Sequence, residues 1–179
     1  MPRSTTYRVI QGIVLAVVLG ILVHIFIIDS YIVRGDSMAP GLLGGDVVFV
    51  NKLRYSRSSP PAEGDIVVGH FRSFSATVVK RVVAVPPERV TVTPTALYVQ
   101  DGREGTSTPI SDIQYIELPG EATNGATTTY RLDPYEYYVL GDNRAISEDS
   151  RTFGPMDGYN IKGKVVARFR LANISFILY

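Results

Sequence analysis

The sequence predicts a mostly β protein, a compact β-barrel-like domain preceded by one N-terminal transmembrane helix. An uncharged apolar run covers residues 9–28. From Tyr31 onward the chain changes to short β-branched and aromatic runs separated by Gly, Pro, Asn and Asp, a pattern typical of strands and turns. No later run keeps the 3.6-residue period of an amphipathic helix. The 179 residues suffice for one ordinary domain plus an anchor, and are too few for two large domains.

The predicted anchor is VIQGIVLAVVLGILVHIFII, Val9 to Ile28. At a rise of about 1.5 Å per residue, these twenty residues span roughly 30 Å, the thickness of a bilayer core. The run is longer than the ~7–15 apolar residues of a cleaved signal peptide and lacks an A-x-A-like cleavage site. We therefore expect a retained anchor in a lipid membrane rather than a cleaved leader or a buried core helix.

Charges that flank the anchor predict its orientation. Arg3 and Arg8 precede it, and Asp29 follows it. Because basic residues favour the cytoplasmic side, residues 1–8 form the predicted cytoplasmic N-terminus and residues 29–179 the extracytoplasmic domain. The sequence therefore indicates a single-pass membrane protein.

Strands account for most of the predicted domain. A loop-rich insertion is expected around residues 89–134, with its Thr-, Ser-, Pro- and Gly-rich part at 103–124. The final run VVARFRLANISFILY carries Arg168 and Arg170, so we expect a closing strand and no second span. The predicted strands are Tyr31 to Arg34, Asp46 to Lys52, Asp65 to His70, Thr77 to Val85, Arg89 to Thr93, Leu97 to Gln100, Gln114 to Leu118, Thr128 to Leu132, Tyr137 to Leu140 and Ile161 to Arg170.

Composition excludes several function classes. Lys and Arg total 18 against 17 for Asp and Glu, so the strongly basic face of a nucleic-acid-binding protein is missing. The absence of cysteine excludes disulfides, Cys-ligated zinc and a Cys nucleophile. Only His24 and His70 are present, and His24 lies in the anchor, which excludes an H-E-x-x-H zinc site. We expect neither a metal nor another cofactor.

Three segments place polar residues among glycines and apolar strands. They are VRGDSMAPGL from Val33, VVKRVVAVP from Val78 and GDNRAISEDSRTFGP from Gly141. Taken singly, each has a structural interpretation: Ser37 suits a turn, and the charges of the third segment suit an ion-pair network. Strand alternation in the second segment turns one of Lys80 and Arg81 inward, and does not say which.

Taken together, the segments favour nucleophilic catalysis. With no cysteine and one histidine outside the anchor, activation of a serine by a lysine is the simplest nucleophilic chemistry that the composition permits. A pair of Ser37 with His70 is the alternative, although no motif surrounds His70. A lysine turned into an apolar interior requires a partner or a function.

At these residues the chain resembles the type I signal peptidases, the membrane-anchored Ser-Lys proteases of bacteria and organelles. GDSMAPGL is similar to the family's G-D-S-M-x-P-T-L segment, and KRVVAVPPE to K-R-V-x-x-x-P-G-D. GDNRAISEDSRTFGPM is similar to G-D-N-R-x-x-S-x-D-S-R-x-F-G-x-V. The three motifs occur in family order directly after the anchor. The resemblance implies the signal peptidase catalytic fold and a serine endopeptidase without metal or cofactor.

The resemblance also implies roles for individual residues. Ser37 becomes the nucleophile, Lys80 the general base and Ser147 the hydroxyl that orients the lysine. Lys80 must then have a lowered pKa, because a free lysine with a pKa of ~10.4 is almost entirely protonated at neutral pH. The apolar run around Lys80 suits that requirement. The residues expected to shape the loop around Ser147 are Asp142, Asn143, Arg144, Asp149, Ser150 and Arg151.

Substrate contacts follow from the same resemblance. The backbone N–H of Ser37 is the expected oxyanion donor, and Gly35 occupies the position that supplies a second donor hydroxyl in some members, which a glycine lacks. Substrates are expected to be exported precursors with small residues at the first and third positions before the cut (Ala-x-Ala type). The apolar residues expected to line the substrate pockets are Tyr31, Val33, Met38, Leu42 and Val79.

The expected partners are signal-peptide-bearing precursors and the lipid membrane, near a protein-export channel. The resemblance favours a bacterial plasma membrane over an organellar one. Two alternatives stay open at this point. One is a self-cleaving Ser-Lys protease of the repressor type, which the anchor and the GDNR segment disfavour. The other is a membrane-anchored β module without catalysis, which the presence of both Ser37 and Lys80 disfavours.

Overall fold

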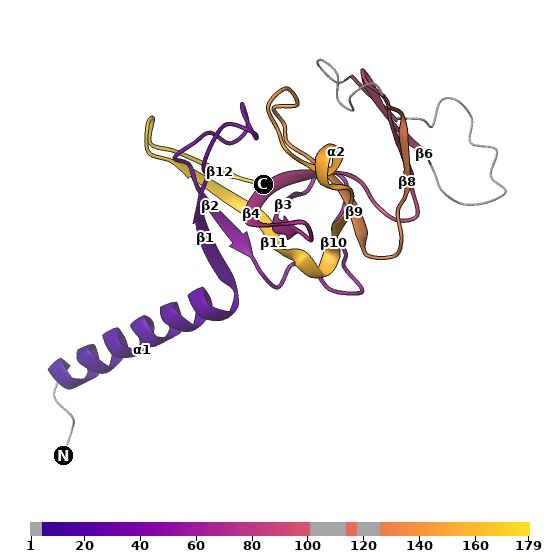
Figure 1. Ribbon diagram of the computed structural model, residues 1–179. Coiled ribbons are helices and arrows are strands. Elements are labelled where there is room, and N and C mark those ends of the chain that lie inside the picture. The colour runs from indigo at the N-terminus through magenta and orange to yellow at the C-terminus, as the bar shows by residue number, and fades with distance from the viewer. Residues whose placement is uncertain (1–4, 101–113, 118–125) are drawn as a thin grey trace.

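The computed structural model describes residues 5–100, 114–117 and 126–179, and its first element is a long apolar helix. Helix α1 covers Thr5–Phe26 and extends away from the rest of the chain (Figure 1). Its segment Thr5–Leu22 is long and apolar enough to cross a membrane and is not buried against protein. The helix starts before the predicted anchor and ends before Ile28, because Ile28 already pairs with Asn51 in the first strand.

The larger sheet has eight strands, all paired antiparallel. Its order is β1-β2-β11-β3-β4-β9-β10, and β12 pairs with β11 off this path. The long strands β4 and β11 run through its centre (Figure 1). The strands are β1 (Ile28–Ile32), β2 (Val47–Asn51), β3 (Ile66–Phe71), β4 (Phe74–Ala84), β9 (Glu136–Leu140), β10 (Met156–Asp157), β11 (Ile161–Arg170) and β12 (Ser175–Leu178).

The segment predicted as an insertion forms a separate four-stranded sheet in the order β7-β6-β5-β8. It lies to one side of the larger sheet (Figure 1). A hydrophobic cluster that includes Val90 and Leu97 of the small sheet and Tyr138 and Leu140 of β9 joins the two sheets. The strands are β5 (Arg89–Val92), β6 (Ala96–Gln100), β7 (Gln114–Glu117) and β8 (Thr128–Arg131); residues 101–113 and 118–125 lie outside the described residues.

Each of the ten predicted strands has an observed counterpart, which confirms the mostly β class. The predicted closing strand is a hairpin, because the chain turns after Arg170 and returns as β12. Two short helices were missed: the single turn α2 (Ser150–Phe153) and the 3₁₀ turn Gly158–Asn160. Neither is long enough to show helical periodicity. Aspartate side chains at Asp149 and Asp157 cap them by accepting backbone N–H groups.

A second apolar cluster lies beneath the loop between β1 and β2. Met38 and Leu42 of that loop are fully buried there against Val48, Val50 and Val165 of the larger sheet. Burying two such side chains contributes about 1.5–3 kcal/mol each. The loop is therefore fixed to the sheet directly after Ser37.

Candidate active site

Ser37 lies in the loop of residues 33–46 that connects β1 to β2. Gly35 has φ +74°, a left-handed conformation that favours glycine. The Ala39 N–H donates to the Asp36 carbonyl at 3.1 Å, and the Leu42 N–H donates to the Met38 carbonyl at 2.9 Å. These turns and the buried Met38 hold the serine in one place at the edge of the domain.

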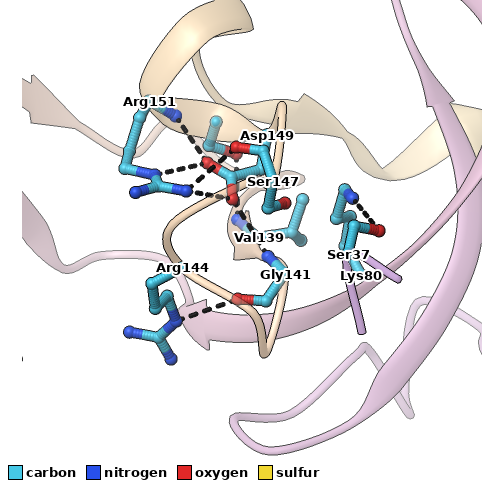
Figure 2. A network of polar contacts seen from close by, with 9 residues as sticks. Ser37, Lys80, Val139, Gly141, Arg144, Ser147, Asp149 and Arg151 are labelled. Carbon is cyan, nitrogen blue, oxygen red and sulfur yellow. Dashed lines mark hydrogen bonds and ion pairs between the residues drawn. The ribbon is translucent and has the colours of Figure 1, made fainter. Parts of the chain in front are cut away.

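Lys80 reaches Ser37 from the middle of β4, opposite Val67 of β3. Its Nζ lies 3.0 Å from the Ser37 Oγ, a hydrogen-bond distance (Figure 2). The side chain of Lys80 is only 3% exposed, so Lys80 is the residue of the pair that turns inward. Arg81 turns the other way and makes a two-pronged ion pair with Asp142, at 2.8 and 2.7 Å.

Burial lowers the pKa of Lys80. Desolvation of the ammonium is the largest cause, and Arg151 lowers the pKa further; Asp149, Glu148 and Asp142 oppose the shift through longer-range attraction. Within the described part of the chain, no carboxylate lies at ion-pair distance from Nζ. The amine is therefore biased toward the neutral form that can accept a proton.

Ser147 lies between the Ser37–Lys80 pair and the ion pair of Asp149 with Arg151 (Figure 2). Its hydroxyl is buried and has no hydrogen-bond partner among the described residues. The Ser147 carbonyl accepts a hydrogen bond from Arg151 Nη2 at 3.0 Å, which fixes the backbone at this point. A buried hydroxyl without a partner is costly, and it is free to bond to a neighbouring amine.

The ion pair of Asp149 with Arg151 organises the loop behind Ser147. Arg151 Nε and Nη2 donate to the two carboxylate oxygens of Asp149, at 2.8 and 2.9 Å. The same carboxylate accepts the Gly141 N–H at 3.0 Å, and Arg144 Nε donates to the Gly141 carbonyl at 2.9 Å. Ser150 Oγ accepts the Val139 N–H at 3.0 Å. The predicted loop residues thus form one network with β9.

Asn143 ties this loop directly to the serine, because its N–H donates to the Ser37 carbonyl at 3.0 Å. Gly141 permits the approach: a Cβ there would overlap both the Ser147 hydroxyl and the Ser37 carbonyl. Sequence analysis did not assign Gly141 a role. Its position beside Asp142 at the end of a buried strand was the available signal.

The oxyanion and pocket assignments stay predictions. The Ser37 N–H has no acceptor among the described residues, as an oxyanion donor requires. The five predicted pocket residues belong to one hydrophobic cluster: Val33, Met38 and Leu42 are buried in it, and Tyr31 and Val79 pack against it half-buried. His70 follows Val67 by three residues on β3, roughly 10 Å further along the strand, and the side chain that contacts the Ser37 hydroxyl is that of Lys80.

A second charged cluster holds the far side of the Ser37 loop, and sequence analysis missed it. Arg170 makes a two-pronged pair with the buried Asp46, at 2.7 Å on each oxygen. Arg168 lies 3.5 Å from Asp46 and donates to the Gly41 carbonyl at 3.2 Å. The two arginines in the apolar C-terminal run were the sequence signal, since a buried cation requires a partner.

Comparison with known proteins places this arrangement in a family. Residues 6–170 match the family described as signal peptidase, peptidase S26. The chain belongs to this family. The signal peptidase IB of Staphylococcus aureus (strain Mu50 / ATCC 700699) is 34% identical over 170 residues, which cover 89% of this chain and 87% of the relative. The signal peptidase I of Bacillus caldolyticus is 34% identical over 151 residues, which cover 82% and 81%.

A solved signal peptidase I from Enterococcus faecalis V583 is 24% identical, with a TM-score of 0.40, and the match covers 59% of this chain and 96% of that chain. Membership in the signal peptidase family confirms the resemblance found in the three motifs. It makes the chain a serine peptidase, a hydrolase of peptide bonds, and α1 fits a single-pass membrane anchor.

Proposed function

We propose that this signal peptidase removes signal peptides from exported precursors by a Ser37–Lys80 dyad, cutting after Ala-x-Ala-type sequences. The observation that carries the proposal is the 3.0 Å contact between Lys80 Nζ and Ser37 Oγ. Burial of the amine and its lowered pKa support the role of Lys80 as a base.

The proposed reaction has two halves. The Ser37 Oγ attacks the scissile carbonyl carbon while its proton passes to the neutral Lys80 amine. The C–N bond then breaks, Lys80 returns the proton to the leaving amine, and an acyl-enzyme on Ser37 remains. A water molecule, deprotonated by Lys80, attacks the ester carbon. The C–Oγ bond breaks, and Lys80 returns the proton to Ser37.

Ser147 and the backbone N–H of Ser37 have supporting roles in this proposal. The buried hydroxyl of Ser147, which lacks a partner among the described residues, would hold the lysine amine toward Ser37. The Ser37 N–H would donate to the developing oxyanion, and Gly35 allows the loop to present it. Tyr31 and Val79 would form shallow apolar walls that admit only small side chains, supported from beneath by the buried Val33, Met38 and Leu42.

In its membrane setting, the helix would anchor the enzyme with its N-terminus in the cytoplasm and the catalytic domain outside. Arg3 and Arg8 before the helix support this orientation, and a bacterial plasma membrane is the proposed location. Such an anchor would keep Ser37 close to the place where a precursor emerges from an export channel.

The direct test is cleavage of a secretory precursor whose signal ends in Ala-x-Ala, with the full chain in detergent or liposomes. Wild type should release one new N-terminus after the second Ala, read by mass spectrometry. Ser37→Ala and Lys80→Ala should each lose at least about 10³-fold in turnover, because the two groups act as one unit. Wild type that stays folded but cleaves no precursor in a panel would instead favour the non-catalytic anchored module.

A further inference from the structure

A groove lined by tyrosines and basic residues lies where the chain leaves α1. Neither Ser37 nor Lys80 is among its lining residues. Thirteen described residues line it, and three of them are basic: Lys52, Arg57 and Lys162. None of these lining residues is acidic, although the whole chain has 18 basic and 17 acidic residues. We propose that this groove binds the phosphate-bearing headgroup of an anionic phospholipid.

The place of the groove in the fold argues for a lipid. The Lys52 N–H donates to the carbonyl of Ile27, the residue after α1, at 2.9 Å. The groove therefore begins level with the end of the membrane-spanning helix. Phe26 and Leu53 at this end are 62% and 65% exposed. Tyrosine, lysine and arginine are the residues typical of a membrane–water interface, where headgroups lie.

Two tyrosine rings form one wall. The rings of Tyr135 and Tyr159 pack 5.6 Å apart, and both are exposed. Tyr135 has φ +77°, a strained conformation for a residue with a side chain, and its carbonyl accepts the Gly158 N–H at 2.7 Å. A Cβ on Gly158 would lie 2.9 Å from the Tyr137 ring. The backbone thus holds an aromatic surface in a fixed position. Such a surface suits the glycerol region of a lipid.

The basic residues provide the charge for a phosphate. Arg57 is exposed and has no carboxylate partner within the described residues. Lys162 Nζ donates to Thr77 Oγ1 at 2.9 Å and lies 5.8 Å from the centre of the Tyr31 ring. Its charge is therefore held in place without a carboxylate among the described residues. Guanidinium and ammonium groups form short charge-assisted hydrogen bonds to phosphate oxygens. An anionic headgroup satisfies both groups, whereas a zwitterionic one brings a competing cation.

Lipid retention by the detergent-purified full chain tests the proposal. Phosphatidylglycerol or phosphatidylcholine is titrated into the sample, and native mass spectrometry counts the bound lipids. Phosphatidylglycerol should bind preferentially. The double variant Arg57→Gln/Lys162→Gln should weaken its binding roughly 25-fold, about fivefold per lost cation, and leave phosphatidylcholine retention unchanged.

Two matched variants complete the test. Arg89→Gln/Arg131→Gln removes the same charge from the neighbouring strands of the smaller sheet and should leave retention unchanged. Arg57→Lys/Lys162→Arg keeps the charge and should retain phosphatidylglycerol. Equal retention of both lipids by wild type, or equal losses in the two Gln variants, would overturn the proposal. Displacement of phosphatidylglycerol by millimolar inorganic phosphate would also overturn it, since the groove would then be a free-anion site.

Discussion

Lys80 and Arg168 are both buried basic residues, 3% and 5% exposed, and they approach opposite sides of the Ser37 loop. Arg168 has the Asp46 carboxylate 3.5 Å away and donates to the Gly41 carbonyl. Lys80 faces the Ser37 hydroxyl, and the described residues place no carboxylate at ion-pair distance from it.

The two sites show how a partner determines what a buried charge does. Beside Asp46 the buried guanidinium contributes to the structure, because attraction and hydrogen bonds offset desolvation. Beside Ser37 the buried amine lacks that compensation, so its pKa is lowered and it can take up a proton during a reaction. One side of the loop is thus suited to stability and the other to chemistry.

The largest expected effect follows from making Lys80 resemble Arg168. Lys80→Arg keeps a basic side chain at this position, but a guanidinium cannot lose its proton at usable pH. We expect turnover of an Ala-x-Ala precursor to fall by at least about 10³-fold, within the range lost with a general base. Steady-state cleavage measures this. Substantial cleavage by the arginine variant would contradict the Ser-Lys mechanism. The matched control is Arg72→Lys, an exchange of one exposed basic residue for another in the turn between β3 and β4.

Removing the carboxylate from the other side of the loop should mainly affect stability. Asp46→Asn leaves Arg168 and Arg170 without their anion, and we expect a loss of roughly 3–5 kcal/mol in the free energy of unfolding. Urea unfolding of the full chain in detergent measures it. The control Asp29→Asn breaks a half-exposed pair with Lys52 (3.6 Å) and should cost less than about 1 kcal/mol. Similar losses in both variants would show that burial of Asp46 adds nothing.

Asp46 also predicts a response to acid. The hydrogen bonds from Arg170 lower the pKa of the Asp46 carboxyl, with burial opposing them. The contribution of the Asp46 carboxylate to the free energy of unfolding is therefore complete above the ordinary aspartate pKa. It is lost as the pH falls through the lowered pKa of the folded state. Wild type should lose stability in that acidic range more steeply than Asp46→Asn does.

A smaller effect is expected at Ser147. Ser147→Ala removes the hydroxyl that we propose bonds to the lysine amine during the reaction, an interaction worth about 1–3 kcal/mol when the partner is charged or buried, or roughly 5- to 150-fold in turnover. The loss should appear in kcat with KM and melting temperature nearly unchanged, because in our proposal the hydroxyl positions Lys80, and in the structure it has no partner among the described residues. Ser73→Ala, in the exposed β3–β4 turn, is the control. A loss confined to melting temperature would assign Ser147 a structural role only.

The smallest expected effect is a gain in stability when the lysine is replaced by an apolar residue. Burial lowers the pKa of Lys80, so the protonated amine destabilises the folded state; that penalty is complete below the folded pKa and vanishes above the unfolded one. Lys80→Met should therefore melt at a higher temperature than wild type at pH 6, with the difference shrinking toward pH 10. Melting curves across this range measure it, and a variant less stable at pH 6 would contradict the penalty.

The sequence by itself determined the anchor, the ten strands and the three motifs that carry Ser37, Lys80 and Ser147. These are local properties: hydrophobic length, strand propensity, turn residues and short patterns of adjacent side chains. The same local reasoning missed α2 and β12, because a capped single turn and a return strand depend on partners elsewhere in the chain.

Only the tertiary structure decided which of Lys80 and Arg81 turns inward. Alternation gives two faces to a strand, and the pairing of β4 with β3 and β9 determines which face meets Ser37, 43 residues away in the chain. The tertiary structure also brought together Asp46 and Arg170, which are separated by 124 positions in the chain. Contacts over such distances depend on register and packing, which no short stretch of sequence contains.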